Sequence, residues 1–407
     1  MSGAGSVIVV GAGPAGATLA YLLASRGVDV TLLERQRDFS REFRGEVLLP
    51  SGLAALDQMG LRAVFDGVPH SKLAAFELYA NAERIFQVAF DPDIGGPNPP
   101  IAFSQPDFLE SVVAAARGHT SFQVEIGASV GDLLYSDGRV TGVQARREGS
   151  ELELRADLVI GADGRASAVR RLAGIEARRH GVDVDVVWFK LPLPDFMSGN
   201  APMRGYIGRA HLLIAYRAPG GLLQVAWVIT KGTFGELRRR GVEDWIAEIS
   251  EHVTPDLAAH LSAHRGALTH PFLLSAVSDR VVRWAIPGAL VIGDAAHTMS
   301  PVGGQGINIA LRDAVVAANH LVPALATGDP AVIDTATQAV ERERLPELAL
   351  IQRMQAIPPR ILMSHTGLGS MLRSMLPRLL RSAPVRAVAA HGIKPIFFGR
   401  GDVRLEV

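Results

Sequence analysis

The chain has 407 residues, of which 48% are hydrophobic and 20% are charged, and its 41 basic and 41 acidic side chains balance. This composition is typical of a globular protein and excludes long disorder, and the length favours two domains. A balanced charge argues against nucleic-acid binding, which usually needs a basic domain.

The absence of cysteine narrows the chemistry further. It excludes disulfides, cysteine-ligated zinc and iron–sulfur clusters, so redox chemistry needs an organic cofactor or a metal held by other ligands, and we expect no metal site. No apolar run reaches about 18 residues without Arg, Pro or Gly, and the N-terminus lacks the basic region of a signal peptide. We therefore expect a cytoplasmic protein.

A strand–helix–strand unit opens the chain. The apolar, β-branched run at residues 6–10 is typical of a buried parallel strand, and residues 17–27 have the composition of a helix that stops at Gly27. Residues 28–35 predict a second strand, which ends at Glu34. This order predicts a βαβ unit.

Three further elements are predicted before residue 120. Residues 51–60 indicate a short helix with Ser51 as its N-cap, and residues 74–90 alternate as strands do. Residues 104–118 indicate a longer helix that is capped by Ser104.

The remaining chain divides into a strand-rich part and a helical part. Asp137 and Gly138 predict a hairpin turn among short strands, and residues 182–231 are rich in strand-forming and aromatic residues. Residues 243–253 predict a surface helix. After Leu311 we expect helices to about residue 390. Five prolines are expected to break them: Pro323, Pro346, Pro358, Pro377 and Pro384.

The first candidate site is the pattern GAGPAG after the first strand. Gly11 permits a tight turn, Gly13 lets the backbone approach a pyrophosphate, and Gly16 allows close helix–strand packing. The helix start supplies free amides and a partial positive charge for the phosphates. Glu34, at the end of the next strand, can bind both hydroxyls of an adenosine ribose. The register of these parts predicts a dinucleotide, FAD or NAD rather than NADP.

Two further glycine-containing segments follow buried strands. In DLVIGADGRASAVR, residues 157–170, a strand runs into a turn at Asp163, and an ordinary strand–turn–helix explains the segment equally well. In GDAAHTMSPVGGQGINIALR, residues 293–312, Asp294 follows a strand and can bind a ribityl hydroxyl. The amides of residues 304–308, at a helix start, can face an anionic ring.

Together these motifs resemble those of the single-component flavin-dependent aromatic hydroxylases, the para-hydroxybenzoate hydroxylase-like class that includes the ubiquinone-biosynthesis hydroxylases. The shared order is GxGxxG…Glu, then GADGxxSxxR, then GDAAHxxxPxxGQGxN, over residues 7 to 313. The resemblance implies an α/β fold with a Rossmann-like FAD-binding domain, an inserted, mainly antiparallel β-sheet substrate domain and a helical C-terminal region. The implied boundaries are 1–72, 101–178 and 276–325 for the FAD-binding domain, 73–100 and 179–275 for the substrate domain, and 326–407 for the C-terminal region.

The resemblance also implies which residues contact the cofactor. Pro301 would lie beside the flavin ring, with the backbone of residues 303–308 around its N1–C2=O2 edge. Asp163 would support both FAD and the approach of NAD(P)H, and Arg44 and Gln105 match flavin-contacting positions. The implied cofactor-binding set is Gly11, Gly13, Gly16, Glu34, Arg35, Arg44, Gln105, Asp163, Asp294, Pro301, Gly303, Gly304, Gly306, Ile307 and Asn308. The implied catalytic set is Arg44, Pro301 and Gly304.

The reaction that the resemblance implies is hydroxylation of an aromatic small molecule, phenolic or polycyclic, by an FAD-dependent monooxygenase. It would consume NAD(P)H and O2 and proceed through a C4a-hydroperoxyflavin. A helix N-terminus beside the ring would stabilise its anionic reduced form. The implied partners are the aromatic substrate, O2 and NAD(P)H, in a monomer or homodimer.

Four residues on strand-like segments are candidates for a substrate pocket, which we expect under the sheet built from residues 74–100 and 182–275. They are Tyr206, His211, Tyr216 and Trp227, although a place in the hydrophobic core explains each of them equally well. In the third motif we expect His297 to be structural, and we interpret the nearby Asp313 as a surface charge.

Other functions stay open on the same fold. A flavin-dependent halogenase is an alternative, but the WxWxIP element and catalytic lysine of such enzymes are matched only in part by WVITKG and RWAIPG. An isoprenoid-type reductase is another, but its cysteine-bearing motifs are absent. The intact third motif argues against a flavin-binding protein without catalysis.

The C-terminal stretch GSMLRSMLPRLLRSAPVRAV, residues 369–388, is basic and amphipathic. Contact with a membrane surface is one interpretation. The favoured interpretation is a helix packed on the core with its arginines in water. The arginines concerned are Arg373, Arg378, Arg381 and Arg386.

Overall fold

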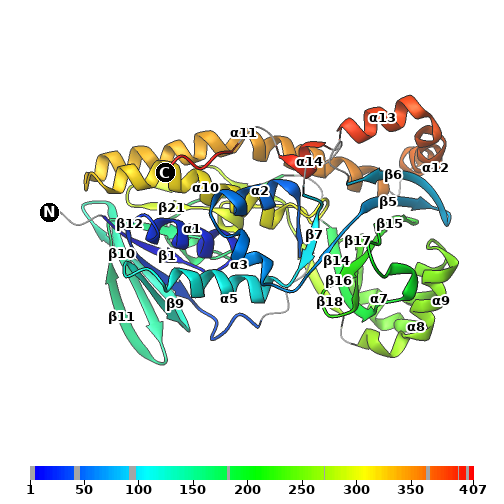
Figure 1. Ribbon diagram of the computed structural model, residues 1–407, viewed down its shortest axis with the longest axis horizontal. Coiled ribbons are helices and arrows are strands. Elements are labelled where there is room, and N and C mark those ends of the chain that lie inside the picture. Colours follow the sequence, from blue (N-terminus) through cyan, green and yellow to red (C-terminus); the bar gives the residue numbers. More distant parts are fainter. Residues whose placement is uncertain are drawn as a thin grey trace.

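The structure is a computed structural model, which describes residues 5–40, 46–90, 98–180, 184–269, 271–363, 367–392, 394–399 and 403–407. Figure 1 shows a six-stranded sheet with its helices on the left and a seven-stranded sheet with shorter helices on the right. The long helix α11 (Pro330–Leu362) runs along the top of the molecule from one to the other. This arrangement confirms the predicted α/β fold.

The six-stranded sheet contains the predicted βαβ unit. Its spatial order is β20 (Ala285–Ile286), β21 (Ala289–Val291), β12 (Leu158–Gly161), β1 (Ser6–Val10), β2 (Asp29–Glu34) and β8 (Phe122–Ile126). Neighbouring strands are parallel, except for β20 and β21. Helix α1 (Pro14–Ala24) packs against α5 (Gln105–Ala116) and α10 (Gly306–Leu325). The central strand β1 is buried on both faces, which explains its continuous apolar run.

Three smaller sheets adjoin this body. One is an antiparallel meander of β9 (Ala128–Ser136), β10 (Arg139–Arg147) and β11 (Ser150–Arg155). Asp137 and Gly138 join β9 to β10 with φ values of 50° and 78°, the two left-handed residues of the predicted hairpin turn. The other two contain β3 (Val47–Leu48), β7 (Ile101–Phe103) and β4 (His70–Lys72), and β13 (Ala177–Arg179), β19 (Asp279–Val281) and β22 (His297–Thr298).

The seven-stranded sheet, called the substrate sheet below, has the predicted mainly antiparallel pairing. Its spatial order is β18 (Phe272–Ala276), β14 (Val184–Pro192), β17 (Leu222–Thr230), β16 (Leu212–Ala218), β15 (Met203–Ile207), β5 (Ala75–Ala80) and β6 (Glu83–Ala89). Only β15 and β5 pair in parallel within it. Its two faces belong to two hydrophobic clusters.

The two faces have different neighbours. One, called the outer face, shares its hydrophobic cluster with α7 (Phe234–Arg240), α8 (Val242–Ser250) and α9 (Pro255–Ala263). The other, called the inner face, shares its cluster with β3 and with the C-terminal helices. Only the inner face therefore adjoins the body that carries the glycine motifs.

One predicted helix start and one predicted capping hydrogen bond are wrong. Helix α2 (Pro50–Gln58) begins before Ser51, because Pro50 occupies the first turn and Leu49 is the N-cap. Ser104 is the N-cap of α5, but its side chain makes no capping hydrogen bond.

Most of the five prolines do not break the helices either. Pro323 lies inside α10, and α11 contains Pro346, Pro358 and Pro359. The break falls instead at Gly328, whose φ is 66°. Packing of the buried stripe of α11 against α10 offsets the hydrogen bonds that the prolines remove.

The last part of the described chain is helical. It contains α12 (Gly367–Arg381), α13 (Ala383–Gly392) and α14 (Lys394–Phe398), with Pro377 inside α12 and Pro384 in the first turn of α13. None of the described helices combines the length and the apolar character that a membrane span requires.

Candidate functional site

The loop between β1 and α1 has the geometry that its glycines predict. Gly11 has a φ of 101°, and a Cβ there would lie 2.6 Å from the Ala162 carbonyl oxygen. A Cβ on Gly16 would lie 1.9 Å from the Gly11 carbonyl oxygen. At Gly13, by contrast, the nearest atom to the Cβ position is 4.0 Å away. The fold itself therefore needs Gly11 and Gly16, whereas Gly13 leaves room for a ligand.

The first turn of α1 presents amides to that space. Gly13 is the N-cap, and no side chain caps the helix, so the first N–H groups can bind an anion. The buried Glu34 carboxylate accepts hydrogen bonds from the N–H groups of Ala12 and Gln36, each at 2.9 Å. These bonds fix the carboxylate at the carboxyl end of β2. Arg35, the next residue, is exposed.

The second motif lies directly against the first. A Cβ on Gly11 would come within 2.7 Å of the Asp163 Cα. The Asp163 carboxylate accepts the Ser167 hydroxyl and the N–H groups of Ala168 and Val169, at 2.6 and 3.2 Å for the two amides. These bonds cap the short helix α6 (Ala168–Leu172). The predicted cofactor contact of Asp163 therefore stays a prediction beside an observed capping role.

The third motif joins the other two. Gly293, with a φ of 58°, approaches α1 so closely that its Cβ would lie 3.0 Å from the Ala15 Cβ. Asp294 pairs with Arg165 of the second motif, at 3.2 Å between Oδ2 and Nε. Three segments separated by more than a hundred residues thus meet at the carboxyl ends of β1, β12 and β21, where ligands bind in open parallel sheets.

The glycine loop before α10 presents a second helix start. Gly303 and Gly304 have φ values of 82° and 62°, and Gly304 donates its N–H to the Pro301 carbonyl oxygen at 3.1 Å. Apart from the adjacent residues and the backbone of α10, no atom in the described part of the chain lies within 4 Å of the Cβ positions of Gly304 and Gly306. Gln305 is the N-cap and does not cap the helix with its side chain. The N-terminus of α10 is thus open to an anionic group, while the adjacent Ile307 is half-buried.

Asn308 has a role beyond the backbone contact that we expected. Its amide nitrogen donates to the carbonyl oxygens of Gly304 and Val47, at 2.8 and 3.2 Å, and its oxygen accepts the N–H of Leu49 at 2.8 Å. The side chain is fully buried and joins the glycine loop to strand β3. Gln105, at the start of α5, is also buried. Arg44 lies outside the described residues.

A buried ionic cluster supports the third motif, so the interpretation of Asp313 as a surface charge is wrong. Its side chain is fully buried and accepts from the His297 Nε2 at 2.6 Å, from the Gly293 N–H at 3.1 Å and from the Arg344 Nε at 2.7 Å. Burial opposes ionisation of Asp313, but the charges and hydrogen bonds of His297 and Arg344 outweigh it and lower the pKa of the carboxyl. His297 is structural, as expected.

The assembled site has the shape and charge pattern of a dinucleotide site with a ring at one end. The N-termini of α1 and α10 supply the positive ends of two helix dipoles. Gly13 leaves space beside the start of α1, and Gly304 and Gly306 leave space beside the start of α10. Glu34, at the end of β2, lies where a carboxylate would bind the hydroxyls of an adenosine ribose. These features fit FAD.

Comparison with known proteins agrees with this fit. The sequence profile described as "FAD binding domain" matches residues 5–350. A 6-methylpretetramide 4-monooxygenase from Streptomyces rimosus is 32% identical, over 93% of this chain and 89% of that protein. The chain belongs to the FAD-dependent monooxygenase family. Members are oxidoreductases that use FAD, and NAD(P)H is their typical co-substrate.

Solved structures of flavoproteins share the fold of this monooxygenase. The P. aeruginosa protein PqsL, in complex with 2-aminobenzoylacetate, superposes with a TM-score of 0.77 at 21% identity, over 91% of this chain and 99% of that one. The p-nitrophenol 4-monooxygenase PnpA of Pseudomonas putida superposes with a TM-score of 0.79 at 19% identity, over 99% of this chain and all of that one.

The structure of the monooxygenase does not bring the four substrate candidates together. Tyr206 and Trp227 lie in the hydrophobic cluster of the outer face, and the His211 ring packs edge-on against Trp227 at 5.9 Å between centroids. Tyr216 alone lies in the cluster of the inner face, with residues of β3. Tyr206, His211 and Trp227 therefore lie on the face away from the glycine motifs, and a substrate contact of these residues stays a prediction.

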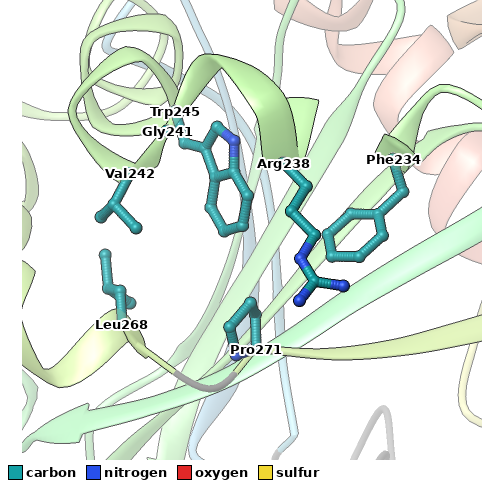
Figure 2. Close-up of a pocket in the computed structure, with 7 residues that line it drawn as sticks. All are labelled: Phe234, Arg238, Gly241, Val242, Trp245, Leu268 and Pro271. Atoms are coloured by element: carbon teal, nitrogen blue, oxygen red, sulfur yellow. The ribbon is translucent and has the colours of Figure 1, made fainter. Parts of the chain in front are cut away.

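The outer face has a pocket of its own, which Figure 2 shows at close range. It measures about 290 Å³ and lies between α7, α8 and the segment before β18. Its deepest wall is the buried Trp245, whose Nε1 donates to the Leu237 carbonyl oxygen at 2.6 Å. The Arg238 guanidinium, which is exposed, extends beside the Phe234 ring. This pocket is on the side of the sheet away from the glycine motifs.

His211 is expected to control the acid stability of the outer face. Burial, together with the His252 charge, lowers its pKa from 6.5 to about 4. Between these values the unfolded chain binds a proton that the folded chain does not, so acid favours unfolding. From pH 7 to 5 this amounts to about 2 kcal/mol. Urea titrations at both pH values should show a smaller loss in His211→Gln than in the wild type; equal losses would contradict the assignment.

Proposed function

We propose that this FAD-dependent monooxygenase hydroxylates a phenolic ring of an aromatic, polycyclic small molecule that binds against the inner face of the substrate sheet. The observation that carries the proposal is the hydroxyl of Tyr216, which is buried on that face without a hydrogen-bond partner in the described part of the chain. The names of the relatives, which oxygenate 6-methylpretetramide and p-nitrophenol, support an aromatic substrate.

The contrast with other tyrosines of the same sheet is informative. The Tyr79 hydroxyl donates to Glu77 at 2.8 Å, and the Tyr206 hydroxyl shares a hydrogen bond of 3.2 Å with Thr254. A buried hydroxyl without a partner costs about 1–3 kcal/mol, and a ligand oxygen that accepts from Tyr216 would offset this cost. Burial, with a smaller effect from the Glu46 carboxylate, raises the pKa of Tyr216 well above its usual value. The hydroxyl therefore stays neutral and can donate to a phenolic oxygen.

The connection from Tyr216 to the flavin site runs through β3. Val47 and Leu49 belong to the same hydrophobic cluster as Tyr216, and Asn308 hydrogen-bonds both of them and Gly304. A substrate oxygen held by Tyr216 would therefore lie on the side of the sheet that faces the glycine loop. The apolar cluster around it excludes water from the site.

The roles of the chain's own residues follow from this arrangement. The amides of α1 and the space at Gly13 would bind the pyrophosphate, and Glu34 would bind the ribose. The open start of α10 would stabilise negative charge on the ring through its positive end. FAD, when bound, supplies electron transfer and oxygen activation. The protein orients the substrate and excludes water.

The decisive experiment is NAD(P)H oxidation by the FAD-loaded enzyme with a panel of phenolic and polycyclic aromatic compounds. We expect at least one compound to stimulate oxidation and to gain the mass of one oxygen atom. A product that forms only with halide present would indicate the halogenase alternative. Tight FAD binding without turnover on the whole panel would indicate a non-catalytic flavoprotein.

Tyr216→Phe should lower kcat/KM for the hydroxylated compound by about 10- to 100-fold, because a hydrogen bond to a charged or partly charged oxygen contributes about 1.5–3 kcal/mol. Tyr206→Phe is the matched control, since it removes a hydroxyl from the outer face of the same sheet. Steady-state kinetics should show the control within about twofold of the wild type. Equal effects of the two substitutions would contradict substrate binding at Tyr216.

A further inference from the structure

Helices α12 and α13 lie together at one end of the molecule, above the substrate sheet in Figure 1. The sequence favoured a helix packed on the core. In the structure α12 packs on the core through Leu380, which is buried, and Leu376, which is half-buried, both in the inner-face cluster. Most of the described side chains of α13 are exposed.

The apolar side of α12 is wider than the part of the helix that packs on the core. At about 100° per residue, Met371, Met375 and Leu379 form one stripe about 80° wide, next to the arc that contains Leu376 and Leu380. The three stripe residues are 57%, 37% and 46% exposed. Val385 and Val388 of α13 are also exposed, the latter by 74%. Together with the three stripe residues, they make up five of the eleven large apolar side chains that are exposed in the described part of the chain.

The charged residues of α12 and α13 themselves are all basic. Residues 367–392 contain four arginines and no aspartate or glutamate, although the whole chain is neutral. Arg378 borders the stripe on the helical wheel and is exposed, and none of the described acidic side chains forms an ion pair with it. Arg386 is exposed and donates to the Arg381 carbonyl oxygen. Arg381 pairs with Glu83 of β6.

We propose that α12 and α13 form a docking surface for an anionic lipid membrane. An exposed apolar stripe bordered by unneutralised arginines is the pattern of helices that lie in a bilayer interface, where apolar side chains enter the acyl region and arginines meet anionic headgroups. A second copy of the chain is a less suitable partner for this surface than a membrane. A two-fold dimer through this face would place the same arginines opposite one another without acids between them.

The surface formed by α12 and α13 lies next to the proposed substrate-binding face. Leu380 of α12 and Tyr216 belong to the same hydrophobic cluster, so the helix that would contact lipid also covers the inner face of the substrate sheet. If the proposed function is correct, an apolar aromatic substrate that partitions into lipid would be concentrated beside its binding face. Membrane docking itself does not depend on the identity of the reaction.

The test is co-sedimentation of the full-length, FAD-loaded enzyme with phosphatidylcholine vesicles, with and without phosphatidylglycerol. We expect at least about tenfold stronger binding to the anionic vesicles and loss of that difference at high salt. Two variants should each lower binding by about tenfold or more while NAD(P)H oxidation without vesicles is unchanged. They are Met371→Ser/Met375→Ser/Leu379→Ser and Arg378→Glu/Arg386→Glu.

The matched control is Arg238→Glu/Arg239→Glu on α7, which changes as many exposed arginines on the other side of the sheet. It should bind vesicles as the wild type does. Equal binding to both kinds of vesicle, or none to either, would overturn the proposal. So would light scattering that shows a dimer in the wild type and a monomer in the triple serine variant, because the stripe would then be a subunit interface. Vesicle binding is measured without turnover, so its failure is distinguishable from failure of the proposed reaction.

Discussion

Gly13→Ala should fold normally but bind FAD more weakly than the wild type, whereas Gly16→Ala should fail to fold. The Cβ of an alanine at 13 has no neighbour closer than 4.0 Å, and the backbone there, with φ of −73°, accepts any residue. The space that it enters is where the pyrophosphate is expected. A methyl group in an otherwise occupied site costs about 1–3 kcal/mol, which is about 5- to 150-fold in FAD affinity.

The second substitution acts on the fold instead. A Cβ at 16 would lie 1.9 Å from the Gly11 carbonyl oxygen and 3.0 Å from the Ala162 Cβ. The loop after β1 and the residue that follows β12 would therefore both have to move. Far-ultraviolet circular dichroism and FAD absorbance distinguish the two effects. Gly67→Ala, at the exposed end of α3 (Arg62–Asp66), is the control and should keep both signals. Normal FAD content in Gly13→Ala would contradict the placement of the pyrophosphate.

Asp313→Ala should destabilise the protein by about 3–5 kcal/mol, because it removes the buried acid that bonds His297 and leaves the buried Arg344 cation with Glu347 alone. It also removes the acceptor of the Gly293 N–H, which positions the loop that carries Asp294. Urea titration of the FAD-free protein measures the first effect, and FAD titration of the remaining folded protein measures the second.

The control is Glu151→Ala, which breaks an exposed ion pair with Arg146 and should cost less than about 1 kcal/mol. The stabilisation from Asp313 should depend on pH with a definite sign. Because its folded pKa is lowered, the contribution is present above the unfolded pKa and is lost as the pH falls through the folded pKa. A cost of Asp313→Ala no larger than that of Glu151→Ala would show that the cluster is not important for stability.

The parts of the fold that depend on local sequence were predictable. The strand at 6–10, its glycine turn and the acid at Glu34 form one continuous pattern, and each was in the predicted place. The meeting of the three motifs followed from the resemblance, and the contacts of Gly11 with Asp163 and of Arg165 with Asp294 now give it a physical basis.

The parts that depend on distant contacts were not predictable. Strand β17 is buried on both faces and has no alternation of apolar and polar residues, so the sequence does not show which face Trp227 joins. Asp313 looks like a surface charge until Arg344, thirty-one residues later, lies beside it. The glutamate at 347, one helical turn after Arg344 on a buried stripe, was the signal that a buried ionic cluster was present.

The parallel pairing of β5 with β15 limits how this enzyme can be divided. Tyr79 of β5 lies opposite Tyr206 of β15, so the edge of the substrate sheet is completed by a segment that is synthesised more than a hundred residues earlier. No single contiguous fragment of residues 184–276 contains the whole sheet. A chimera that exchanges substrate preference with a relative must therefore carry both segments, and during synthesis β5 must wait for its partner strand.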